Sequence, residues 1–171
     1  MSAVLFAVDE TDIAFLKSQS DDLLSLYNPD KTIKDNWFQV LKEKYSEKGR
    51  FYHNLSHVKT LLNLLEPLKD KIQEHNAIRF SIWFHDVIYN TKRNDNEEKS
   101  ARLASEMLGK LHVNTETIIF VSDLILATKG HSGNNLSEDA KLFLDMDLAI
   151  LGMSEEYMSN TAKQSEKNIP G

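Results

Sequence analysis

Apolar residues recur at spacings of three and four along most of the chain, with polar residues between them. This is the period of an amphipathic helix, and no hairpin dipeptide separates alternating apolar runs of the kind that pair as strands. Breaks at Pro29, Gly49, Pro67 and Gly130 separate the periodic stretches. The pattern predicts an all-α protein, a compact multi-helix bundle with helices over about 9–27, 33–46, 58–65, 72–89, 95–111, 115–129 and 137–152.

Three of these helices carry start signals in the sequence. Asp95 followed by Glu98 forms a D-x-x-E word, the pattern of a capping box. Thr115 and Ser137 stand directly before apolar periodic stretches and are expected to cap the helices that follow.

Size and composition limit the classes of protein that this chain can represent. With 171 residues, 41% of them hydrophobic, it suits a single domain over residues 1–171. A net charge of −6 argues against binding nucleic acid through a broad basic surface. No stretch approaches the roughly 20 apolar residues of a membrane span, so no membrane partner is expected. The absence of cysteine excludes disulfides and thiol chemistry and fits a cytoplasmic protein.

The stretch W-F-H-D-V-I at positions 83–88 places a histidine and an aspartate inside an apolar run. In the helix predicted there, Ile78, Ile82, His85 and Tyr89 share one face, so His85 is expected to point inward. A buried carboxylate at Asp86 is costly without a partner. That partner can be another side chain, a water cluster or a metal ion.

Two further polar residues stand among apolar neighbours, His57 and Asp147. A lone histidine such as His57 is more often a satisfied core residue than a ligand. Asp147 shares a predicted helix face with Phe143 and Ile150 and is expected to be buried. It could be a metal ligand, or it could form an ion pair with a lysine or arginine. Two histidines and two aspartates from three helices would suit Mn, Fe, Co, Ni or Zn better than Mg, which prefers oxygen ligands.

Four short sequence motifs resemble those of a known family, both in their residues and in their order along the chain. They are Y-H-N-L-S-H-V (52–58), W-F-H-D-V-I-Y (83–89), N-E-E-K-S-A (96–101) and L-D-M-D-L-A-I-L-G (144–152). Over about residues 33–158 the chain resembles the HD-domain superfamily, and within it the predicted HD-superfamily metal-dependent phosphohydrolases. The resemblance implies four metal ligands: His57, His85, Asp86 and Asp147. Because adjacent helix residues diverge by about 100°, His85 and Asp86 are expected to reach one ion only from a helix flank.

Five other residues are weaker candidates. His53, four residues before His57, could orient a ligand, contact substrate or cap a helix. The resemblance assigns Glu97 or Glu98 to water activation or proton transfer, although the capping box already explains Glu98. Lys129 could neutralise a phosphate, or it could be a lysine at a helix C-terminus that interacts favourably with the helix dipole. His131 could bind phosphate or a second metal, and exposed loop histidines are common.

The resemblance implies hydrolysis of a phosphate ester or anhydride in a small, nucleotide-like metabolite, with a divalent metal as cofactor. The alternative is a non-catalytic HD-type protein that binds a metal or a ligand. Residues 159–171 have little apolar periodicity and depart from the family, so the chain looks truncated. If helices that normally cover residues 137–152 are missing, an exposed apolar face should favour self-association and reduce activity.

Overall fold

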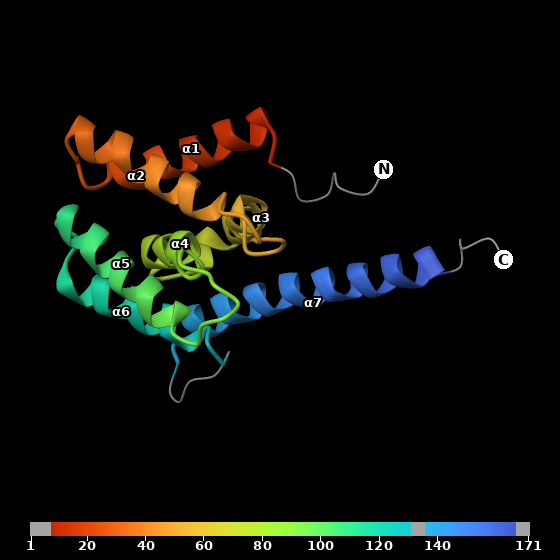
Figure 1. Ribbon diagram of the computed structural model, residues 1–171. Coiled ribbons are helices and arrows are strands. Elements are labelled where there is room, and N and C mark those ends of the chain that lie inside the picture. Colours follow the sequence, from red (N-terminus) through yellow and green to blue (C-terminus); the bar gives the residue numbers. More distant parts are fainter. Residues whose placement is uncertain (1–7, 131–135, 167–171) are drawn as a thin grey trace.

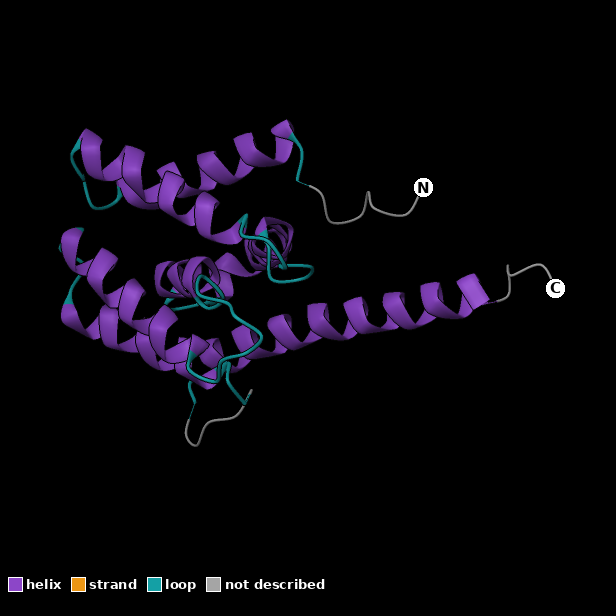
Figure 2. Cartoon of the chain, viewed as in Figure 1, coloured by secondary structure: helices purple, strands orange, loops and turns teal. Residues whose placement is uncertain are grey.

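The computed structural model describes residues 8–130 and 136–166, and only the backbone of 154–166. Within these ranges the protein consists of helices and loops without strands, so the prediction of an all-α fold is confirmed (Figures 1 and 2). The elements are α1 (Glu10–Ser25), α2 (Lys31–Tyr45), α3 (Leu55–Leu65), a 3-10 helix (Glu66–Lys71), α4 (His75–Phe84), α5 (Asn96–Lys110), α6 (Thr115–Ala127) and α7 (Glu138–Glu166).

Helix α4 runs through the middle of the bundle (Figure 1). Every residue from Ala77 to Phe84 is buried, as expected of a helix whose apolar residues face all sides. The helix contacts α3, α5, α6 and α7. Its one buried cation, Arg79, reaches α1, where Nη2 donates to the carbonyl of Gln19 at 3.0 Å and to Asp22 Oδ2 at 2.9 Å.

The remaining helices enclose α4 from two sides, with α1 and α2 on one side and α5 and α6 on the other (Figure 1). Trp37 of α2 packs edge-on against Phe84 of α4, with ring centroids 5.2 Å apart. Aromatic pairs of this geometry stabilise a core beyond the area they bury. The central helix is therefore held rigidly, and the chain that leaves its end starts from a fixed point.

Helix α4 is shorter than the predicted stretch 72–89. It ends at Phe84, with His85 as its C-cap, and the chain then turns. Tyr89 therefore does not continue the helix face that His85 was expected to share with it. Side chains from other parts of the chain donate hydrogen bonds to the backbone carbonyls near the C-terminal end of α4. One of them is the Tyr45 hydroxyl, which donates to the carbonyl of Trp83. These carbonyls therefore have hydrogen-bond partners without a further helical turn.

Of the three predicted caps, Ser137 is confirmed and Thr115 is wrong, while Asp95 does precede α5 as predicted but without the side-chain hydrogen bond of a capping box. Ser137 Oγ accepts from the Ala140 amide and caps α7. Asn114, rather than Thr115, caps α6, because its side chain accepts from the Thr117 amide. The Asp95 carboxylate makes no cap hydrogen bond, because it binds the Arg93 guanidinium instead.

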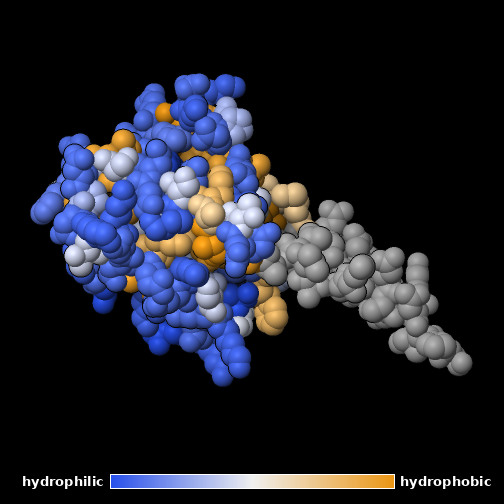
Figure 3. Space-filling model, turned by 90° about the horizontal axis from the view of Figure 1, so that it is seen from above, coloured by the Kyte–Doolittle hydropathy of each residue, from blue (hydrophilic) through white to orange (hydrophobic). Residues whose placement is uncertain are grey.

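Helix α7 continues to Glu166, past the predicted end at Gly152, and projects away from the rest of the molecule (Figure 1). Residues without apolar periodicity can still extend a helix when their intrinsic propensities allow it. Leu148 and Met153 on this helix are exposed. The face in Figure 3 is mostly hydrophilic, with apolar residues gathered where the grey atoms begin. Among the described residues, none of the helices combines the length and the apolar character needed to cross a membrane.

Candidate metal centre

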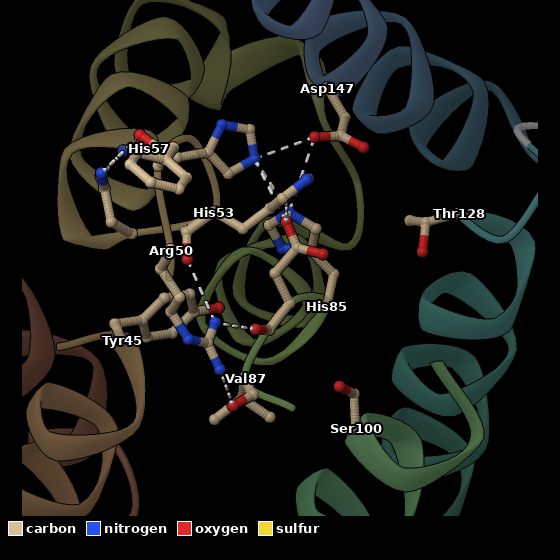
Figure 4. Close-up of polar contacts among 12 residues, drawn as sticks. Tyr45, Arg50, His53, His57, His85, Val87, Ser100, Thr128 and Asp147 are labelled. Carbon is tan, nitrogen blue, oxygen red and sulfur yellow. Dashed lines mark hydrogen bonds and ion pairs between the residues drawn. The ribbon is translucent and has the colours of Figure 1, made fainter. Parts of the chain in front are cut away.

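Three elements bring the four predicted ligands to one place, as Figure 4 shows for His57, His85 and Asp147 and as the contacts of Asp86 with the two histidines show for the fourth. His57 lies in the first turn of α3, where Asn54 caps the helix by accepting from the amides of Ser56 and His57. His85 and Asp86 follow the last turn of α4. Asp147 projects from the buried face of α7. The convergence that the sequence pattern predicted is therefore present in the fold.

The donor atoms lie within contact distance of one another. His57 Nε2 is 3.0 Å from both His85 Nε2 and Asp147 Oδ1, and His85 Nε2 is 3.6 Å from Asp147 Oδ1. Asp86 Oδ2 closes the group, 3.1 Å from His85 Nε2 and 3.7 Å from His57 Nε2.

The end of α4 explains how two adjacent residues face the same point. The sequence predicted that His85 and Asp86 would approach an ion from the flank of a continuing helix. That prediction is wrong, because the helix stops at Phe84 and the turn after it redirects the Asp86 side chain toward His85. The other end of this turn is pinned by Ser100 of α5, whose hydroxyl accepts from the Ile88 amide.

The His85 ring is fixed in one orientation by its neighbours. Its Nδ1 lies 3.0 Å from the carbonyl of Ile82, which can only accept, so Nδ1 carries the hydrogen. Phe143 of α7 packs against the ring edge-on, with centroids 5.6 Å apart. In the neutral ring this leaves the Nε2 lone pair directed at the cluster, as a metal-binding histidine requires.

His53 also belongs to the group, and the sequence alone left its role open. Its Nδ1 donates to Asp86 Oδ2 at 2.6 Å, and its ring lies against Tyr89 with centroids 4.5 Å apart. It is not a helix cap, because Asn54 holds that position. His53 orients Asp86, which is one of the three roles left open. The available signal was the spacing of four between His53 and His57 at the start of a helix.

The cluster has one open edge. The His57, His85 and Asp147 side chains are buried, whereas those of Asp86 and His53 are 19% and 21% exposed. Water or a substrate would therefore meet the site on the side of Asp86 and His53.

The charges of these groups depend on one another. Burial opposes the charged form of His85, but the carboxylates of Asp86 and Asp147 outweigh it and raise the His85 pKa well above 6.5. Burial likewise favours the neutral forms of both aspartates, but the neighbouring histidines lower the pKa of Asp86 and that of Asp147 well below 3.8. The buried carboxylate of Asp147 and the partly buried carboxylate of Asp86 thus require positive charge beside them, which protons on the rings or a metal ion can provide.

The spacing of the donor atoms would allow them to hold a metal ion. Around an ion bound at about 2.0 to 2.2 Å, neighbouring ligand atoms lie about 3.0 to 3.5 Å apart. The five distances that involve a histidine, to the other histidine or to either aspartate, run from 3.0 to 3.7 Å. Two imidazole nitrogens with two carboxylate oxygens form a set that suits Mn, Fe, Co, Ni or Zn. Within the described residues, His57, His85 and Asp147 form one possible metal-binding group, and His53, His57 and Asp86 form another.

Among the described residues, the possible metal-binding groups do not include Glu97, Glu98 or Lys129. Glu98 forms an ion pair with Lys129, whose Nζ lies 2.6 Å from its Oε1 and also donates to the carbonyl of Asn94. Glu97 is half-buried in the first turn of α5. His131 lies outside the described residues.

Comparisons of the chain with protein-family models, with curated proteins and with solved structures found no match.

Proposed function

We propose that the protein is a metal-dependent phosphohydrolase of the HD type, acting in the cytoplasm on a phosphate ester or anhydride of a small, nucleotide-like metabolite. The observation that carries the proposal is the convergence of His57, His85, Asp86 and Asp147, with an open edge on the side of Asp86. The order of the four sequence motifs supports the same reading.

In this proposal the four side chains hold the ion and His53 keeps the Asp86 carboxylate turned toward it. A divalent ion held there would polarise a phosphoryl oxygen and lower the pKa of a water molecule, so that attack on phosphorus proceeds near neutral pH. The substrate and water would reach the ion at the open edge, beside Asp86 and His53. The side formed by His57, His85 and Asp147 is buried and so is shielded from solvent. Glu97 is the candidate for proton transfer, because Glu98 is engaged by Lys129.

That ion pair also favours the second candidate, a metal- or ligand-binding protein without turnover. Lys129 and Glu98 lie 2.6 Å apart, so in this arrangement each charge is paired with the other and not with a ligand, although both side chains are nearly half exposed. The two candidates share the metal site and differ only in whether a phosphate bond is broken.

The test is metal analysis of the purified protein followed by phosphate release from a panel of nucleotides and phosphoesters with Mn, Co or Mg. We expect one bound divalent ion and phosphate release that a chelator abolishes. Asp147→Asn should lose both properties, while Asp145→Asn, an exposed aspartate on the same helix, should keep them. Bound metal without phosphate release from any compound would favour the second candidate, and absence of bound metal would contradict the phosphohydrolase and the metal-binding form of the second candidate.

A further inference from the structure

The side chain of Arg50 is almost fully enclosed beside the candidate metal centre, although the guanidinium group is always charged. Only 2% of the side chain is exposed, and the residue precedes the loop that carries His53. Figure 4 shows its guanidinium pointing at backbone oxygens below the cluster. A buried cation is costly without full pairing, so its contacts identify what it does.

The two terminal nitrogens of the guanidinium donate to backbone carbonyls from two separate segments, while the buried Nε has no hydrogen-bond partner among the described residues. Nη1 donates to the carbonyl of His53 at 3.1 Å and to that of Asp86 at 2.6 Å. Nη2 donates to the carbonyl of Val87 at 2.8 Å and lies 3.3 Å from Glu47 Oε2. The group therefore bridges the loop before α3 and the turn after α4.

Aromatic rings complete the enclosure. The guanidinium carbon lies 5.2 Å from the centre of the Tyr45 ring and 5.6 Å from that of Tyr89. Rings at this distance attract the cation through their negative faces. Tyr89 also packs against the His53 ring. The Tyr89 ring therefore contacts both Arg50 and His53, the residue whose backbone carbonyl Arg50 binds.

The two bridged segments have little regular structure to fix them. His53 lies in a bend and Asp86 in a turn, and neither is held within a helix ladder. Their side chains nevertheless meet at 2.6 Å, between His53 Nδ1 and Asp86 Oδ2. An arginine fits this task, because its planar fork supplies several donors in fixed directions, whereas a lysine offers a single flexible ammonium.

We propose that Arg50 is a positioning residue that sets the distance between His53 and Asp86, and so the open edge of the candidate metal centre. The metal part of this inference rests on the proposed function. Arg50 acts through the backbone and does not meet the substrate, because its terminal nitrogens are occupied and its side chain is enclosed.

The experiment compares Arg50→Met with Arg79→Met. Arg79 is a matched control, since its side chain is 8% exposed and it also donates to a backbone carbonyl and a carboxylate, but it joins α4 to α1. Both variants should unfold at lower temperature. Only Arg50→Met should speed hydrogen exchange at the amides of Asn54 and Val87, which donate to the carbonyls of Tyr52 and Phe84.

Metal affinity gives the second readout, with Mn²⁺ or Co²⁺ as the probe. Loss of a group that holds a metal ligand in place typically weakens binding about 10- to 100-fold. We expect a loss of that size for Arg50→Met, a smaller one for Arg50→Lys, and none for Arg79→Met. If Arg50→Met does not fold, Arg50→Lys takes its place in both measurements.

Equal effects of the Arg50 and Arg79 variants on exchange at Asn54 and Val87 would overturn the proposal, because Arg50 would then be a general stabiliser. Unchanged affinity in an Arg50 variant whose parent binds metal would overturn it as well. If the parent binds no metal, the proposed function fails, while the exchange measurement still decides whether Arg50 fixes the two segments.

Discussion

Nε2 of His57 and Nε2 of His85 lie 3.0 Å apart in the interior, although 28 residues separate them along the chain. Both nitrogens also face Asp147 Oδ1. His85 Nε2 presents a lone pair, because Nδ1 of that ring carries the hydrogen, so the close contacts with His57 and Asp147 need a hydrogen on His57 Nε2, a further proton or a metal ion between these atoms.

Replacing Asp86 should cost both metal and stability. In Asp86→Ala, His85 and His53 lose a carboxylate partner, and an unsatisfied buried group costs about 1 to 3 kcal/mol. We expect a lower free energy of unfolding in urea, and no bound metal after gel filtration. Asp145→Ala, an exposed control, should match the parent in both measurements. Retention of metal by the Asp86 variant would remove this residue from the ligand set.

Replacing Glu97 should separate metal binding from turnover. Loss of a general acid or base typically lowers the rate about 10²- to 10⁴-fold. We expect Glu97→Gln to keep its metal and to lose activity in that range, measured as phosphate release. Glu98→Gln is the control, since Glu98 pairs with Lys129. Equal rates for Glu97→Gln and the parent would exclude Glu97 from the mechanism.

The metal-free protein should be most stable in mildly acidic solution. The raised pKa of His85 contributes stability that is complete below pH 6.5 and lost as the pH rises through the pKa of the folded state. The lowered pKa values of Asp86 and Asp147 contribute stability that is present above 3.8 and lost as the pH falls further. Thermal unfolding in the presence of a chelator should therefore give its highest midpoint temperature between pH 3.8 and pH 6.5.

Added metal should offset the loss of thermal stability above pH 6.5, because metal binding requires deprotonated histidine rings. We expect Mn²⁺ or Co²⁺ to raise the unfolding temperature more at pH 8 than at pH 6. A metal effect that is larger at pH 6 would contradict histidine ligation.

The exposed apolar side chains of α7 should promote self-association. Leu148 and Met153 both lie on this helix and are 44% and 56% exposed. We expect sedimentation to show a concentration-dependent increase in mass, which Leu148→Glu with Met153→Glu abolishes without lowering the unfolding temperature. A parent that stays monomeric at high concentration would refute this expectation.

The sequence was sufficient to predict what local periodicity and residue chemistry determine. Apolar spacing predicted the all-α fold, and the helix face that His85 shares with Ile78 and Ile82 predicted that His85 points inward. The contact between Asp86 and His53 was not predicted, because it depends on α4 ending at Phe84. That end is set by Tyr45 and Arg50, which bind carbonyls some 37 residues away along the chain, and local patterns carry no such information.

The central claim is that His57, His85, Asp86 and Asp147 hold one divalent ion. Anomalous diffraction from a crystal grown with Mn²⁺ tests it most directly. The account predicts one strong anomalous peak about 2.0 to 2.3 Å from His57 Nε2, His85 Nε2 and one oxygen of each aspartate. No peak among these atoms, with Mn²⁺ bound elsewhere or not at all, would contradict it.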